Sequence, residues 1–152
     1  MRIGFGYDSH RLAEGRDFIL GGVKIPFEKG LLGHSDADVL THAVIDALLG
    51  ATANKDIGRH FPDTDDKYKG VSSVKLLSHV METLGHRVIN IDCTVLAQRP
   101  KLSPYIDRIR ETLAGYLQTD IGNVSVKAKT EEGADAVGRG ELVKAYAIVL
   151  ID

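Results

Sequence analysis

The stretch HSDADVLTHAVIDALLGAT, residues 34–52, decides the fold of this chain. Its apolar residues recur at helical spacing: Val39, Leu40, Ala43, Val44, Ala47 and Leu48. Either Asp36 or Asp38 is placed to cap the first turn, because a carboxylate accepts hydrogen bonds from the free N–H groups there. The stretch therefore predicts a helix whose apolar stripe packs against the rest of the chain.

Strands and further helices are expected on both sides of this helix. Alternating β-branched residues, paired glycines and helix caps predict a strand at residues 2–7, a hairpin at 18–26 turning at Gly21-Gly22, a helix from Ser72 to Leu84, a strand at 87–98, a helix from Ser103 to Leu117, and strands at 124–130 and 142–151. This order predicts an α/β (α+β) sandwich with helices on one face of a mixed sheet. The other sheet face is also apolar and has no helix left to cover it, which favours an oligomer.

Length and composition indicate one soluble domain, residues 1–152, with 43% apolar and 26% charged residues. The net charge of 19 − 21 = −2 gives no positive field that would attract nucleic acid or an anionic membrane. No apolar run approaches the ~18 residues of a membrane span. The N-terminal segment carries polar residues where a signal peptide needs its apolar core, and no transit peptide is expected. Since Cys93 has no partner for an internal disulfide, we expect a reduced, cytoplasmic setting.

A metal site is the first chemical hypothesis. Asp8 and His10 are two residues apart at the end of the first strand, so their side chains point to the same side. His42, on the predicted helix, is the natural third ligand, and three protein ligands leave one position open for a substrate. Asp38 and Asp46 lie one turn before and after His42, where an acidic neighbour would fix the imidazole tautomer. The competing interpretation is an ordinary helical histidine without a metal.

Phosphate-binding hints come from basic residues near the later strands. Lys127, Lys129 and Arg139 cluster near Thr130 and Glu132, while Arg99 and Lys101 follow the strand that contains Cys93. Cations and a hydroxyl could hold a diphosphate, with Glu132 on a divalent ion, although solvated strand ends would look the same. The long polar segment 54–70 is a candidate ligand-binding loop. The chain has no nucleotide-binding G-x-x-x-x-G-K-[ST], no nucleophile elbow and no paired C-x-x-C.

Five blocks of the sequence together carry a family resemblance: GFGYDSHRL, LLGHSDADVLTHAVIDALLGA, DIGRHFPDTD, RPKLSPYI and KAKTEE…GRGE. In this order and at these spacings they resemble the 2-C-methyl-D-erythritol 2,4-cyclodiphosphate synthases, and the resemblance covers essentially the whole chain. It implies a phosphorus–oxygen lyase of the non-mevalonate route to isoprenoid (terpenoid) precursors. The expected reaction converts 4-diphosphocytidyl-2-C-methyl-D-erythritol 2-phosphate into the cyclic diphosphate and CMP. The resemblance also implies a homotrimer with an active site at each subunit boundary.

The same resemblance assigns roles to individual residues. Asp8, His10 and His42 would hold zinc, with manganese or cobalt as possible substitutes, and Glu132 would hold magnesium or manganese at the diphosphate. His34 and Thr130 would stabilise the transition state. The expected substrate contacts are Asp8, Ser9, His10, His34, Ser35, Asp56, Ile57, Gly58, Phe61, Pro62, Asp63, Thr64, Asp65, Ala97, Gln98, Arg99, Pro100, Lys101, Leu102, Ser103, Lys129, Thr130, Glu131, Glu132 and Arg139.

The chain departs from the family pattern at one segment. Lys129-Thr130 stands where two threonines are usual, and Ala134-Asp135-Ala136 replaces a common leucine-glycine-phenylalanine run, so binding of isoprenoid diphosphates on the trimer axis is in doubt. Two alternatives stay open. A metal-dependent phosphate-ester hydrolase would activate water at the open position and give linear products. A non-catalytic trimeric binding module would hold a structural metal with four ligands.

Overall fold

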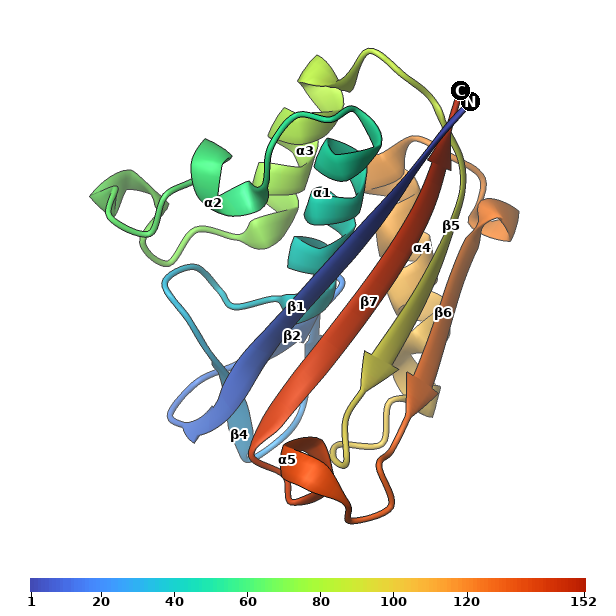
Figure 1. The fold of residues 1–152 in the computed structure, drawn as a ribbon. Coiled ribbons are helices and arrows are strands. Elements are labelled where there is room, and N and C mark those ends of the chain that lie inside the picture. Colours follow the sequence, from blue (N-terminus) through green and yellow to red (C-terminus); the bar gives the residue numbers. More distant parts are fainter.

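The computed structural model describes residues 1–152 as a mixed sheet with helices on one side (Figure 1). Its strands are β1 Arg2–Glu14, β2 Phe18–Leu20, β3 Val23–Ile25, β4 Lys29–Leu32, β5 Val88–Leu96, β6 Val124–Lys129 and β7 Leu142–Ile151. Its helices are α1 Val39–Ala51, α2 Ile57–His60, α3 Ser73–Leu84, α4 Ile106–Leu117 and α5 Asp135–Gly138, with short 3₁₀ turns at Asp66–Tyr68, Ser103–Tyr105 and Ile121–Asn123. The predicted α/β class and mixed sheet are therefore confirmed.

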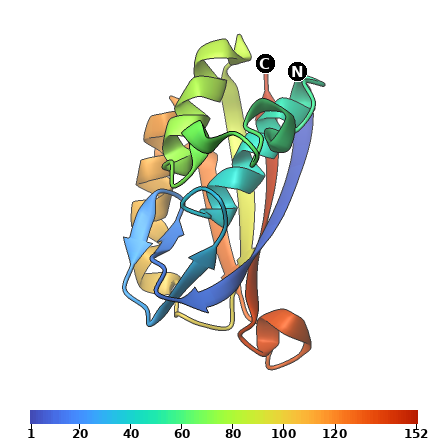
Figure 2. The ribbon, with the colours of Figure 1, turned by 90° about the vertical axis from the view of Figure 1, so that its left-hand side faces the viewer.

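The large sheet has five strands in the order β4-β1-β7-β5-β6, and β2 and β3 form a separate hairpin. β5 and β6 run parallel, whereas the other neighbours in the sheet are antiparallel. β1 and β7 pair along ten consecutive positions, from Arg2 opposite Ile151 to Arg11 opposite Leu142. Seen from the side, α1, α3 and α4 all lie against the same face of the sheet (Figure 2).

The long helix α1 reaches the sheet because β1 has no side chains where the two cross. A Cβ added at Gly6 would lie 1.9 Å from the carbonyl oxygen of Ala43, and one at Gly4 would lie 1.9 Å from that of Ala47. Only glycine permits backbone contact at this range. The helix predicted within residues 34–52 is confirmed as Val39–Ala51, and Asp38 rather than Asp36 caps it by accepting from the Thr41 N–H.

The opposite face of the sheet is apolar and exposed, as the alternation of β1 predicts. Ile3, Phe5 and Tyr7 are 70%, 61% and 44% exposed, and Ile148 of β7 beside them is 46% exposed. The intervening β7 residues Val143, Ala145, Ala147 and Val149 are fully buried beneath the helices. A continuous apolar strip on a sheet face is typical of a surface that another chain covers.

Several predicted boundaries were wrong. The first strand runs to Glu14 rather than ending at residue 7, because it pairs with β7 as far as Arg11 and with β4 from Arg11 to Glu14. The helix predicted from Ser72 to Leu84 is confirmed as α3, with Ser72 at its N-cap position, although the Ser72 side chain makes no capping hydrogen bond. Ser103 lies within a 3₁₀ turn instead of capping α4. The sequence patterns also missed β4, α2 and α5, whose four residues each are too few to show a periodicity. None of the helices is long and apolar enough to span a membrane.

Candidate metal centre

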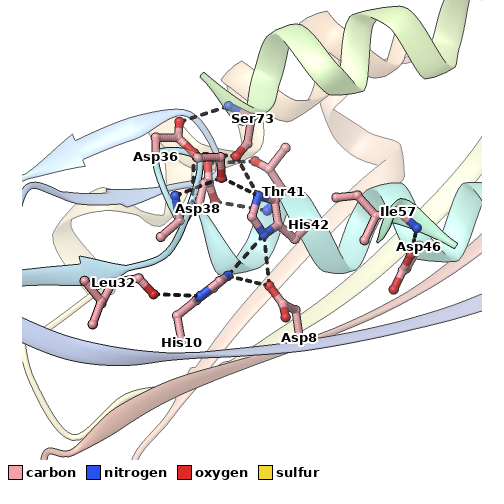
Figure 3. Close-up of polar contacts among 12 residues, drawn as sticks. Asp8, His10, Leu32, Asp36, Asp38, Thr41, His42, Asp46, Ile57 and Ser73 are labelled. Carbon is pink, nitrogen blue, oxygen red and sulfur yellow. Dashed lines mark hydrogen bonds and ion pairs between the residues drawn. The ribbon is translucent and has the colours of Figure 1, made fainter. Parts of the chain in front are cut away.

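The three predicted ligands come from two elements that the glycines of β1 bring together. Asp8 and His10 project from β1 on the side that faces α1, and His42 lies in the first half of that helix (Figure 3). The strand carries no side chain at Gly6, so α1 sits close enough for His42 to reach the strand. The predicted placement of both β1 residues on one side is confirmed, although they lie in the middle of the strand and not at its end.

The ligand atoms of the three residues form a small triangle. Asp8 Oδ2 lies 2.9 Å from His10 Nε2 and 3.0 Å from His42 Nδ1, and the two nitrogens are 3.1 Å apart. A metal with ligands at 2.0–2.1 Å in tetrahedral geometry keeps them about 3.3 Å apart. The triangle is therefore close to the size that a zinc-like ion requires. No other group of His, Cys, Asp or Glu residues in the chain has this arrangement.

Hydrogen bonds on the far side of each ring show which nitrogens are free. His10 Nδ1 lies 3.0 Å from the Leu32 carbonyl oxygen, so Nδ1 carries a proton, and the neutral form of the ring turns its Nε2 lone pair inward. His42 Nε2 lies 2.7 Å from Ser73 Oγ and 3.1 Å from Ser35 Oγ. With a carboxylate oxygen facing the ring nitrogens, the donor set is electron-rich and fits a divalent cation.

The residues of the triangle shift one another's pKa values. Burial raises the pKa of Asp8, but hydrogen bonds from His10 and His42 and their charges outweigh it and lower that pKa to about 2. Burial lowers the pKa of His10, and the hydrogen bond and charge of Asp8 more than compensate, so this pKa is raised. A carboxylate and an imidazole therefore favour a positive charge between them, supplied by protons or by a metal.

The prediction that an acid on α1 fixes the His42 tautomer was wrong. Asp38 is fully buried and faces away, accepting hydrogen bonds from Gly21 N at 2.9 Å, Gly22 N at 2.7 Å and both donors of Thr41. Asp46 accepts from the Ile57 N–H at 2.7 Å and so fixes the start of α2. The carboxylates of Asp38 and Asp46 thus accept hydrogen bonds from backbone N–H groups of neighbouring loops, and neither is left to pair with the His42 imidazole. The contact to His42 comes instead from Ser73, which sequence analysis missed.

The metal group lines a cavity of ≈ 370 Å³ that includes many predicted substrate contacts. Its walls are Asp8, His10, Gly33, His34, Ser35, His42, Ile57, Gly58, Phe61, Asp63, Tyr68 and Leu76. His34 Nε2 lies 3.3 Å from the Asp65 carbonyl oxygen, so the histidine is tied to the polar loop that faces it. Gly33, Tyr68 and Leu76 were not predicted.

Some predicted contacts do not line this cavity: Ser9, Asp56, Pro62, Thr64 and Asp65. Ser9 alternates to the other face of β1, away from Asp8 and His10. Asp56 caps α2 by accepting from the Arg59 N–H at 2.9 Å, and Asp65 accepts from the Lys67 N–H. These carboxylates shape the loop backbone.

A second and larger cavity of ≈ 650 Å³ lies where β5 and β6 end. Its walls are Phe27, Glu28, Ala97, Gln98, Arg99, Pro100, Lys101, Leu102, Ser103, Ala128, Lys129 and Thr130. The predicted segment 97–103 and the pair Lys129-Thr130 thus meet in one hollow. Phe27, Glu28 and Ala128 were missed. The segment between the hairpin and β4, which carries the first two, has no motif.

The basic cluster proposed around Thr130 is more dispersed than the sequence indicated. Lys127 pairs with Asp92, and Arg139 donates to Glu141 at 2.6 Å. Arg139 lines a small cavity of ≈ 230 Å³ that also includes Arg99. Glu131 and Glu132 lie in the turn after β6, outside the walls of the larger cavity.

Comparison with known proteins gives this arrangement a family. The model of the YgbB family matches residues 1–152. The chain belongs to the YgbB family. A relative from Pelotomaculum thermopropionicum, named 2-C-methyl-D-erythritol 2,4-cyclodiphosphate synthase, is 60% identical over 154 residues, which cover 99% of this chain and 95% of the relative.

Solved structures agree with this YgbB assignment. A 2C-methyl-D-erythritol-2,4-cyclodiphosphate synthase solved in its CDP-bound form is 39% identical, with a TM-score of 0.90 and coverage of 99% of this chain and 100% of that one. The bifunctional IspDF from Campylobacter jejuni is 38% identical with a TM-score of 0.94, and this chain spans 42% of its length. The fold is therefore shared along the whole of this chain.

Proposed function

We propose that residues 1–152 form one cyclodiphosphate synthase domain. It would convert 4-diphosphocytidyl-2-C-methyl-D-erythritol 2-phosphate into 2-C-methyl-D-erythritol 2,4-cyclodiphosphate and CMP, as a phosphorus–oxygen lyase in isoprenoid precursor synthesis. The observation that carries the proposal is the triangle of Asp8, His10 and His42, which lines a cavity beside His34 and Ser35. The names of two relatives that are 60% and 58% identical support the same reaction.

The reaction needs positioning and charge neutralisation more than covalent help from the protein. The 2-phosphate oxygen attacks the β-phosphorus of the cytidine diphosphate, and CMP leaves with the electrons of the broken P–O bond. A divalent ion held by Asp8, His10 and His42, zinc in our proposal, would polarise a phosphate oxygen and neutralise its charge. His34 and Ser35, which line the same cavity, would bind that phosphate and hold it in line.

The polar loop on the other side of the metal cavity would bind the erythritol portion. Ile57, Gly58, Phe61 and Asp63 line the cavity, and Asp63 offers a carboxylate to sugar hydroxyl groups. The loop is fixed at its start by Asp46, which accepts from the Ile57 N–H. Asp56, Pro62, Thr64 and Asp65 would then act through the loop backbone, and Ser9 through its strand.

The larger cavity would bind the cytidine diphosphate. Segment 97–103 would receive the nucleoside, and Lys129 and Thr130 on its wall would contact the phosphates, with Thr130 stabilising the transition state. Glu131 and Glu132 follow Thr130 in the chain, and Glu132 would hold magnesium or manganese at the diphosphate. Arg139, which lines a smaller cavity together with Arg99, would contact the phosphates from there. The related structure solved with CDP supports a cytidine nucleotide as the ligand.

Within one chain the two cavities share no wall residue. A homotrimer would complete the site, with the metal cavity of one subunit facing the larger cavity of the next. The exposed strip of Ile3, Phe5, Tyr7 and Ile148 supports this assembly, because burying it between subunits removes apolar surface from water.

Phosphorus NMR tests the proposal directly. Protein supplied with the diphosphocytidyl substrate, zinc and magnesium should produce the two coupled signals of a cyclic diphosphate together with CMP. Linear phosphate products would instead identify a hydrolase. Zinc binding without any turnover would favour a binding module in which the metal is structural.

A further inference from the structure

The ring nitrogen of His42 that points away from the metal triangle contacts a serine that no part of the proposed reaction uses. Ser73, the first residue of α3, is fully buried, and its Oγ lies 2.7 Å from His42 Nε2. The same hydroxyl contacts Asp36 Oδ1, and Asp36 Oδ2 accepts from the Ser73 N–H at 3.0 Å. Figure 3 shows the three side chains in a row, with the metal triangle at the other side of the His42 ring.

The direction of each hydrogen bond follows from what each group can donate. An ionised carboxylate only accepts, so the Ser73 hydroxyl must give its proton to Asp36. Ser73 Oγ is then left as an acceptor toward His42, and Nε2 must carry the ring proton. His42 Nδ1 consequently presents a lone pair to the triangle, which is the form that binds a metal.

We propose that Ser73 and Asp36 are positioning residues that hold His42 in its Nε2-protonated tautomer and so prepare Nδ1 as a metal ligand. The inference rests on the metal site of the proposed function. It adds the residues that set the affinity of that site.

A competing contact explains why the His42 tautomer has to be fixed by Ser73 and Asp36. Ser35 Oγ also lies 3.1 Å from His42 Nε2, and it accepts from the Ala37 N–H at 3.2 Å. The Ser35 hydroxyl can therefore donate to an unprotonated Nε2. In that tautomer Nδ1–H would donate to Asp8 Oδ2, 3.0 Å away, and Nδ1 would have no lone pair to bind a metal. The two serines favour opposite tautomers, and Asp36 decides between them by acting through Ser73.

The backbone holds this row of residues from both ends. The Gly70 N–H donates to the His34 carbonyl at 2.8 Å, and the Asp36 N–H donates to the Val71 carbonyl at 3.0 Å. Asp36 and Ser73 therefore belong to two segments that are already joined. The side chains of Asp36 and Ser73 therefore have little freedom to rotate away from His42, which is the property required of groups that orient a metal ligand.

The test combines histidine nitrogen NMR with zinc affinity. In the metal-free wild-type protein at about pH 8, where an ordinary imidazole is neutral, His42 should show the Nε2-protonated pattern. Ser73→Ala should shift His42 toward the other tautomer and weaken zinc binding by roughly 10–100-fold. Asp36→Asn should shift both readouts in the same direction, because an amide can donate to Ser73 and turn its hydroxyl toward His42.

Ser78→Ala is the matched control, since Ser78 is in the same helix and donates only to the Val74 carbonyl. It should leave tautomer and zinc affinity unchanged. A purely structural role of Ser73 would lower the unfolding temperature of Ser73→Ala without moving either readout, and would overturn the inference. An Nδ1-protonated His42 in the wild type would overturn it without any variant. A wild-type protein that binds no zinc at all would refute the metal site itself.

Discussion

Gly6→Ala is the substitution that tests most directly how the fold builds the site. The new Cβ would lie 1.9 Å from the Ala43 carbonyl oxygen, 2.6 Å from the Ala47 nitrogen and 2.9 Å from the Ala43 carbonyl carbon. All of these are backbone atoms of α1, so no side chain can rotate to relieve the contact. The helix itself has to move away from β1.

The size of the displacement follows from ordinary contact distances. Reaching a separation of about 3.4 Å from the present 1.9 Å requires a retreat of about 1.5 Å. Overpacking of this kind costs about 1–3 kcal/mol, and rigid backbone on both sides places this site at the upper end. About 3 kcal/mol lowers the unfolding temperature of a chain of this size by roughly 6–12 °C.

The same displacement should damage the metal site. His42 precedes Ala43 in α1, so its Nδ1 would move away from Asp8 Oδ2, from which it is now separated by 3.0 Å. We expect zinc affinity to fall by about 10-fold or more. Gly4→Ala makes an equivalent clash with Ala47, one helical turn farther from His42, and should destabilise the protein similarly with a smaller effect on zinc.

Thermal unfolding and zinc titration check both expectations. Gly115→Ala is the control for the substitution itself, because Gly115 lies in α4 with nothing within 4 Å of the added Cβ. It should raise stability by about 0.5–1 kcal/mol. A Gly6→Ala protein that unfolds at the wild-type temperature and binds zinc normally would refute the argument that backbone contact between β1 and α1 positions His42.

Three other outcomes are expected. His42→Ala should lose bound zinc while keeping its circular dichroism spectrum, because α1 tolerates a small residue there; full metal occupancy measured by mass spectrometry would contradict the ligand assignment. In the metal-free protein, Asp8 has a pKa of about 2 against an ordinary 3.8, and the pKa of His10 is raised above 6.5. Their contact should therefore stabilise the fold fully between pH 3.8 and 6.5, and less as the pH falls through 2 or rises through the pKa of His10. Urea unfolding of Asp8→Asn should show a weaker dependence of the free energy of unfolding on pH. Phe5→Glu, at a side chain 61% exposed in the single chain, should yield folded monomers in ultracentrifugation; an intact trimer would argue against the proposed sheet-face interface.

The sequence predicted those parts of the fold whose patterns are long. The helix at residues 34–52 and the strands at 87–98 and 142–151 carry enough apolar positions to define a period, and each is present. The alternation of Ile3, Phe5 and Tyr7 also predicted the open apolar face. The pair Asp8 and His10 could be placed on one side of a strand by parity alone.

The surroundings of the metal site could not be predicted in this way. Which acid supports His42 depends on where loops place competing donors, and Gly21, Gly22 and Ile57 take Asp38 and Asp46 away from it. The supporting serine lies 31 residues from His42 in the chain. Contacts at this separation depend on tertiary packing, which no local pattern encodes.

The crossing of β1 and α1 also matches the repeat of the strand to that of the helix. Two residues of strand advance by about 6.6–6.8 Å, and one turn of helix by about 5.4 Å. Successive even positions of the strand therefore meet nearly successive turns, Gly4 at Ala47 and Gly6 at Ala43. The spacing from Gly4 to Asp8 then sets where the carboxylate arrives relative to His42. Inserting one residue there would turn Asp8 to the opposite face of the sheet, and inserting two would carry it past the histidine. The position of His42 on α1 therefore fixes the length of this segment, just as the contact with α1 fixes its two glycines.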